Sequence, residues 1–75
     1  MDDSILRTAM DVLKISMEEA KQYSKPLPEL DAFYFWKPTR GGGKVIIKTN
    51  GEKLAAGSAL SFDKVLSAFQ DGKRN

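Results

Sequence analysis

The chain has 75 residues, of which 41% are hydrophobic and 29% charged, and it contains neither cysteine nor histidine. This length fits one small domain over residues 1–75. The composition excludes a disulfide framework and leaves no usual ligands for zinc, so we expect no metal and no other cofactor. The acidic start Met1-Asp2-Asp3 lacks the positive region of a signal peptide, and no apolar run approaches the ~18 residues of a membrane span. We therefore expect a cytoplasmic protein without membrane contact.

The net charge of +2 is unevenly distributed along the chain. Residues 1–35 carry four basic and seven acidic residues, whereas residues 36–53 carry five basic residues against one acidic residue. A basic segment suits an anionic partner. The alternative is that these charges keep the edge of a hairpin soluble.

The first predicted element is an amphipathic helix over residues 3–23. Its apolar residues recur at alternating spacings of four and three, which is the period of one helix face. They are Leu6, Met10, Leu13, Met17 and Ala20. We expect the two methionines on this face to be buried in the core. Lys25-Pro26 ends the helix because a residue before proline avoids helical angles, and residues 25–28 are predicted to form a stiff connector.

An aromatic strand is predicted over residues 32–37. Alternation along a strand places Tyr34 and Trp36 on one face and Phe33 and Phe35 on the other. Both faces are apolar, so one must meet the helices while the other is half exposed or covered by a partner. These four aromatic residues are the candidates for a protein-binding surface.

Two further strands and a final helix complete the predicted fold. A loop leads to a strand over residues 44–49, and Asn50-Gly51 predicts a type I′ turn into a third strand over residues 52–56. Ser61 is suited to cap a helix over residues 62–70, and Leu60 and Val65 can form an apolar staple at its start. Gly72 is placed to end this helix. We expect an α+β fold in the order α-β-β-β-α, with both helices packed on one face of a three-stranded antiparallel meander.

Catalysis is difficult to build from these residues. Without histidine or cysteine, the chain lacks the usual proton shuttle and thiol nucleophile, so we expect no enzyme. The segment Arg40-Gly41-Gly42-Gly43-Lys44 resembles a phosphate-binding loop, but it lacks the required spacing and leads into a strand. Its glycines indicate either an anion-binding loop or positive backbone angles. The candidate anion-binding residues are Lys37, Arg40, Lys44 and Lys48.

Two families resemble parts of this pattern. The order of helix, three strands and helix resembles the double-stranded RNA-binding domain, although residues 38–43 lack that family's Gly-Pro-x-His stretch. The aromatic strand, residues 44–47, Asn50-Gly51-Glu52 and Gly57-Ser58 resemble features of small bacterial immunity-type proteins that neutralise toxins. The second resemblance implies stoichiometric binding to a protein partner without catalysis.

The sequence therefore predicts a non-enzymatic module that binds a protein partner or associates with itself, most simply as a homodimer. The reason is the two-sided aromatic strand in a chain too small to cover it. The alternative is an anion or nucleic-acid binder that uses the basic hairpin over residues 37–48, with Tyr34 and Trp36 available for stacking on bases.

Overall fold

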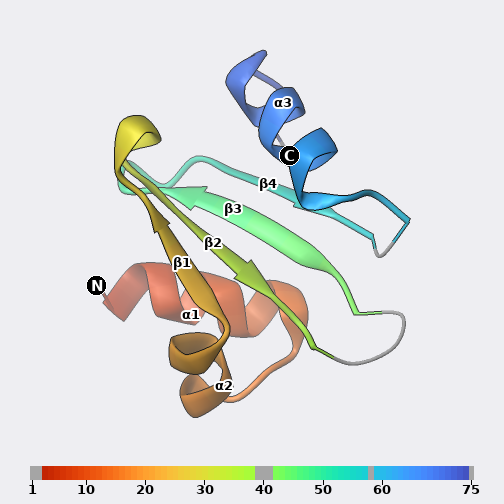
Figure 1. Ribbon diagram of the computed structural model, residues 1–75. Helices are drawn as coiled ribbons and strands as arrows, with labels where there is room; N and C mark the ends of the chain where they lie inside the picture. Colours follow the sequence, from red (N-terminus) through yellow and green to blue (C-terminus); the bar gives the residue numbers. More distant parts are fainter. Residues whose placement is uncertain (1–2, 39–41, 58, 75) are drawn as a thin grey trace.

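The computed structural model describes residues 3–38, 42–57 and 59–74 and shows an antiparallel sheet with helices on both sides (Figure 1). The elements in chain order are α1 (Asp3–Leu13), α2 (Met17–Gln22), β1 (Ser24–Leu27), the 3-10 turn η1 (Pro28–Leu30), β2 (Ala32–Trp36), β3 (Lys44–Lys48), β4 (Lys53–Ala56) and α3 (Phe62–Gln70). The α+β class is confirmed. The prediction of three strands is wrong, because the sheet has four strands in the order β1-β2-β3-β4.

The helices lie on opposite faces of the sheet, so the prediction that they share one face is wrong. The helices α1 and α2 cover the face that carries Phe35, Val45 and Ile47. The helix α3 covers the other face, which carries Tyr34 and Ile46. Figure 1 shows this three-layer arrangement, with α3 on the side of the sheet away from the N-terminus.

The strand β3 explains why both faces need a cover. Its residues Val45, Ile46 and Ile47 are consecutive, and each is at most 1% exposed. A strand that is buried on both faces reads as a continuous apolar run, whereas a strand with one wet face alternates. Burial of this strand therefore requires helices on each side of the sheet.

The predicted first helix is interrupted at Lys14, which adopts a left-handed conformation with φ of 56°. The amide of Ile15 donates to the carbonyl of Met10 over 3.3 Å, which is the backbone bond of a Schellman helix end. Ser16 then begins α2 with a capping box: its hydroxyl accepts from the Glu19 amide, and its own amide donates to the Glu19 carboxylate. This break turns Met17 outward, where it is 45% exposed, so the prediction that Met17 lies in the core is wrong.

The predicted connector over residues 25–28 overlaps the edge strand β1, Ser24–Leu27. It pairs antiparallel with β2, with Lys25 opposite Tyr34 and Leu27 opposite Ala32. Proline is tolerated in an edge strand when its nitrogen faces away from the neighbouring strand. Asp31, with φ of 51°, completes the turn that returns the chain from β1 through η1 into β2.

The turn between β3 and β4 differs from the predicted type I′ turn. Gly51 has a positive φ of 98°, but Asn50 does not. The Gly51 amide donates to the Lys48 carbonyl, and the Lys48 amide donates to the Glu52 carbonyl. This is the pattern of a three-residue loop in which a type I turn is followed by a left-handed glycine. The Asn50 side chain supports the turn by accepting from the Glu52 amide.

The final helix begins and ends where the sequence predicts. The Ser61 hydroxyl accepts from the Lys64 amide, and Gly72 has φ of 94° at the C-terminal end. Leu60 is 42% exposed and therefore does not bury the apolar staple suggested by the sequence. Beyond the helix, the Arg74 guanidinium lies 3.7 Å from the centre of the Phe69 ring and donates to the Phe69 carbonyl. These contacts fasten the C-terminal end of α3.

Candidate functional site

The four aromatic residues of β2 are covered more completely than the sequence predicts. Phe35 is 0% exposed and Tyr34 is 8% exposed, while Phe33 and Trp36 are half-buried. Phe33 and Phe35 pack under α1, and Tyr34 and Trp36 belong to the core under α3. Each face of this strand thus has one buried aromatic residue and one half-buried aromatic residue. Trp36 and Phe33 keep partial exposure.

The basic candidates do not share one position on the sheet. Lys44 and Lys48 flank the buried Ile46 on β3 and lie on the face of α3, at opposite ends of the strand. The Lys37 amide donates to the Gly43 carbonyl, and strand alternation sends the Lys37 side chain toward the other face. The prediction at Arg40 lies outside the described residues.

Gly43 lies close to neighbouring backbone and does not have a positive φ. A Cβ at Gly43 would lie 3.1 Å from the Ala56 carbonyl oxygen and 3.5 Å from a methyl carbon of Leu13. The first of these contacts is tighter than usual, so a side chain at Gly43 would require the backbone at Ala56 to shift by a few tenths of an ångström. Gly43 therefore supports packing between the hairpin and α1, which is a structural role.

A row of aromatic rings crosses the sheet on the face of α3. The ring centres of Tyr23 and Trp36 are 6.0 Å apart, those of Trp36 and Tyr34 are 5.3 Å apart, and those of Tyr34 and Phe62 are 4.4 Å apart. Tyr34 and Trp36 are stacked with their planes 23° apart. The Lys25 ammonium lies 5.5 Å from the centre of the Phe62 ring, within the range of a cation–π contact. We call Tyr23, Trp36, Tyr34 and Phe62 the aromatic row.

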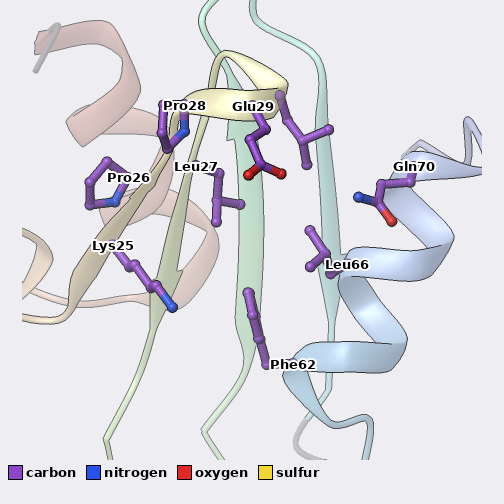
Figure 2. Close-up of a pocket in the computed structure, with 9 residues that line it drawn as sticks. Lys25, Pro26, Leu27, Pro28, Glu29, Phe62, Leu66 and Gln70 are labelled. Carbon is purple, nitrogen blue, oxygen red and sulfur yellow. The ribbon is translucent and has the colours of Figure 1, made fainter.

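Beside this row, α3 leaves an open groove against β1 and η1, with a volume of about 270 Å³. Figure 2 shows Leu27 pointing from β1 toward α3, and Phe62 and Leu66 pointing back across the gap. Leu27, Leu30, Phe62 and Leu66 are all half-buried. The residues that line the groove are Lys25, Pro26, Leu27, Pro28, Glu29, Leu30, Phe62, Leu66 and Gln70.

The groove opens because α3 does not reach across the whole sheet. The helix packs on β3 and β4, and Val65 and Phe69 are buried beneath it. Phe62 and Leu66, one turn apart, lie at the border facing β1. Among the described residues, no helix covers the β1 half of this face, which leaves apolar side chains partly exposed.

A second, more polar pocket of about 290 Å³ continues from the groove at its η1 end. It shares Glu29, Leu30 and Gln70 with the groove. Its further lining residues are Asp31, Lys48, Phe69 and Arg74. The pocket thus combines two acidic and two basic side chains, and Arg74 already forms an ion pair with Glu52 at 3.3 Å.

The outer edge of β1 is poorly suited to adding another strand. The Trp36 amide donates to the Tyr23 carbonyl, and hydrogen bonding alternates along an antiparallel pair. The backbone groups of Lys25 and Leu27 therefore face β2, and those of Ser24 and Pro26 face outward. Because Pro26 has no N–H, Ser24 carries the outward donor of this strand. Backbone pairing with a further strand at this edge would therefore be incomplete.

One titratable group on this face, the Tyr34 phenol, has a shifted pKa. Burial raises the pKa of the Tyr34 phenol above its ordinary value of 10.0, because desolvation disfavours the phenolate. Tyr34 therefore serves as an uncharged ring at neutral pH. Within residues 3–38, 42–57 and 59–74, no group of three or more acidic side chains is arranged to hold a metal ion.

The groove residues were missed by the sequence interpretation. Leu27 lies between two prolines, which favours a connector, and Phe62 and Leu66 belong to the apolar stripe of the last helix, which favours packing on the sheet. The available signal was the spacing of Phe62, Leu66 and Gln70 along one stripe of the last helix, beyond the stripe needed to bury Val65 and Phe69.

No helix in the described part of the chain is long and apolar enough to cross a membrane. The observed order α-α-β-β-β-β-α also differs from the helix, three strands and helix on which the resemblance to the double-stranded RNA-binding domain rests. No family model, curated protein or solved structure matches this chain.

Proposed function

We propose that the protein is a non-enzymatic protein-binding module whose binding surface is the groove between β1, η1 and α3. The observation that carries this proposal is the partial exposure of Leu27, Phe62 and Leu66 in one continuous hollow of about 270 Å³. Apolar side chains gathered in a concave site are favourable anchors for a partner's apolar side chains. The proposal includes no catalysis, in keeping with a chain without histidine or cysteine.

The shape of the site favours a segment of a protein over a large flat interface. A volume of about 270 Å³ lies at or just below the lower end of typical ligand pockets, so it has room for only a few apolar side chains. The groove is bounded by β1 on one side and by a helix on the other. This arrangement supports recognition of a short peptide segment by its side chains.

Self-association through the β1 edge is less well supported. Two copies paired antiparallel about Lys25 would place two lysine side chains directly opposite each other, and like charges in such cross-strand pairs are destabilising. Pro26 would also remove donors from the shared ladder. We therefore favour a different protein as the partner, with a homodimer as the alternative that size measurements would reveal.

Nucleic-acid binding is the second candidate, and the stacked pair of Tyr34 and Trp36 is the observation that favours it. Base stacking on aromatic rings is tolerant of sequence and needs basic residues nearby. Lys44 lies opposite Trp36 in the register of β2 and β3. However, the lining of the groove is mostly apolar, and its one lysine, Lys25, is accompanied by the acidic Glu29. This lining suits apolar side chains better than a row of phosphates.

Selection from a displayed library of random short peptides tests the proposed function. The full chain is the bait, and binding of the selected peptides is then measured on two variants. Gln70→Trp fills the groove from an exposed position of α3, as Figure 2 shows Gln70 reaching toward β1, and should reduce affinity at least about tenfold. Met17→Trp, a change at an exposed site on α2, should leave affinity unchanged. Peptides that bind both variants equally would contradict the proposal.

A further inference from the structure

The two ends of the groove carry opposite charges, and this difference indicates what kind of partner the groove binds. Lys25 lies at the end beside Phe62, and Glu29 lies at the end beside η1 (Figure 2). Lys44 adds a second positive charge near the aromatic row, because it is paired with Trp36 in the strand register. The two lysines come from β1 and β3 and therefore flank Tyr34 and Trp36 on β2.

Within residues 3–38, 42–57 and 59–74, neither Lys25 nor Lys44 forms an ion pair with an acidic side chain. Arg74 pairs with Glu52 at 3.3 Å and does not involve either lysine. Lys25 is exposed and Lys44 is half-buried. Two unpaired cations beside a partly apolar, partly exposed site attract a negatively charged group, and their effect is stronger where bound side chains exclude water.

From this arrangement we propose that the partner segment carries apolar side chains followed by one or more carboxylates. This inference rests on the proposed function and specifies its ligand. The apolar side chains contact Leu27, Phe62 and Leu66, and the carboxylates contact Lys25 and Lys44. Glu29 at the opposite end disfavours a carboxylate there and so sets the direction in which the segment lies.

The segment binds through its side chains and not as an added strand. On the outer edge of β1, Ser24 has a backbone N–H that can donate a hydrogen bond, whereas Pro26 has none. A hydrogen-bonded ladder with an added strand would therefore be incomplete. The contacts that remain are apolar burial in the groove and charge-assisted hydrogen bonds to lysine. Specificity then comes from the spacing between apolar and acidic side chains.

The peptides selected on the full chain also test this inference. We expect Asp or Glu to be enriched beside Leu, Phe or Trp. The double variant Lys25→Glu with Lys44→Glu should weaken their binding about tenfold or more, and raising salt from about 50 to about 300 mM should weaken it several-fold. The control Lys21→Glu with Lys64→Glu makes the same change in charge at exposed sites and should alter affinity less than about twofold.

Two results would overturn the inference, and they separate it from the proposed function. Peptides that are blocked by Gln70→Trp but show no acidic enrichment, and that bind the Lys25→Glu, Lys44→Glu variant normally, would remove the acidic partner and leave the groove as a binding site. Both proposals would be overturned if the selected peptides bound the Gln70→Trp variant as tightly as the parent chain. They would also be overturned if oligothymidylate displaced the peptides at moderate salt.

Discussion

The centre of the Phe62 ring on α3 lies 4.4 Å from the centre of the Tyr34 ring on β2. This contact joins the last helix to the centre of the sheet at the point where the groove begins. Tyr34 is nearly buried, whereas Phe62 is half-buried, so the pair forms a border between core and surface. The position of α3 over the sheet, and thus the width of the groove, depends on this contact and on the buried Val65 and Phe69.

Truncating Leu13 and truncating Met17 should have unequal effects on stability, although the sequence pattern places both side chains on the same helix face. Leu13 is 5% exposed, whereas Met17 is 45% exposed. Leu13→Ala should lower the free energy of unfolding by about 2–5 kcal/mol, because it leaves a cavity in the core. Met17→Ala should change it by less than about 0.5 kcal/mol. Urea denaturation followed by circular dichroism provides both values, and equal losses would show that α2 packs its methionine inward.

The left-handed residue at the end of α1 predicts a stabilising substitution. Lys14 has φ of 56°, a conformation that costs a residue with a side chain about 1–2 kcal/mol relative to glycine. Lys14→Gly should therefore raise the free energy of unfolding by about 1 kcal/mol. Lys21→Gly, inside α2, serves as the opposite control and should lower it by a similar amount. A loss of stability in Lys14→Gly would contradict the helix break.

The edge of β1 predicts that self-association can be switched on. Pro26 removes an outward donor, and Lys25 opposes pairing with a second copy through like-charge repulsion. The double substitution Lys25→Thr with Pro26→Thr should produce a concentration-dependent dimer in sedimentation velocity, while the parent chain remains monomeric. A parent chain that already sediments as a dimer at micromolar concentration would show that another surface mediates association.

The buried phenol of Tyr34 predicts a loss of stability at high pH. Its pKa is raised by burial above 10.0, so the folded state holds the proton more tightly than the unfolded state does. The corresponding stability is present below pH ~10 and is lost as pH rises through the folded-state pKa. Tyr34→Phe should remove this contribution and make the decline with pH shallower, as measured by denaturation at several alkaline pH values. An identical decline in both proteins would show that the Tyr34 phenol ionises without opposing the fold.

The elements that depend on local chemistry could be predicted from the sequence. The Ser61 cap and the Gly72 terminator set the ends of α3, because each feature is contained within a few residues. The break after α1 also has a local signal, the Ser16 to Glu19 capping box, but the apolar period continues through it and favours one long helix. The left-handed Lys14 carries no such signal, because that conformation usually belongs to glycine.

The remaining errors come from contacts between distant segments. Whether Pro26 can lie in a strand depends on which side of β1 has a neighbour, and only the sheet order decides this. The division of α1 and α3 between two faces likewise depends on tertiary packing, although the continuous apolar run in β3 indicates two buried faces. The groove is formed by β1 and α3, which are far apart in the sequence, so its residues resemble a connector and a core stripe until the fold brings them together.

The most direct test of the binding site is a map of backbone amide shifts in the labelled full chain during titration with a selected peptide. We expect the largest shifts at Leu27, Leu30, Phe62 and Leu66, and we expect Gln70→Trp to abolish them. Shifts gathered instead on α1 and α2, or shifts that only an oligonucleotide produces, would contradict the claim that the groove between β1 and α3 binds a protein partner.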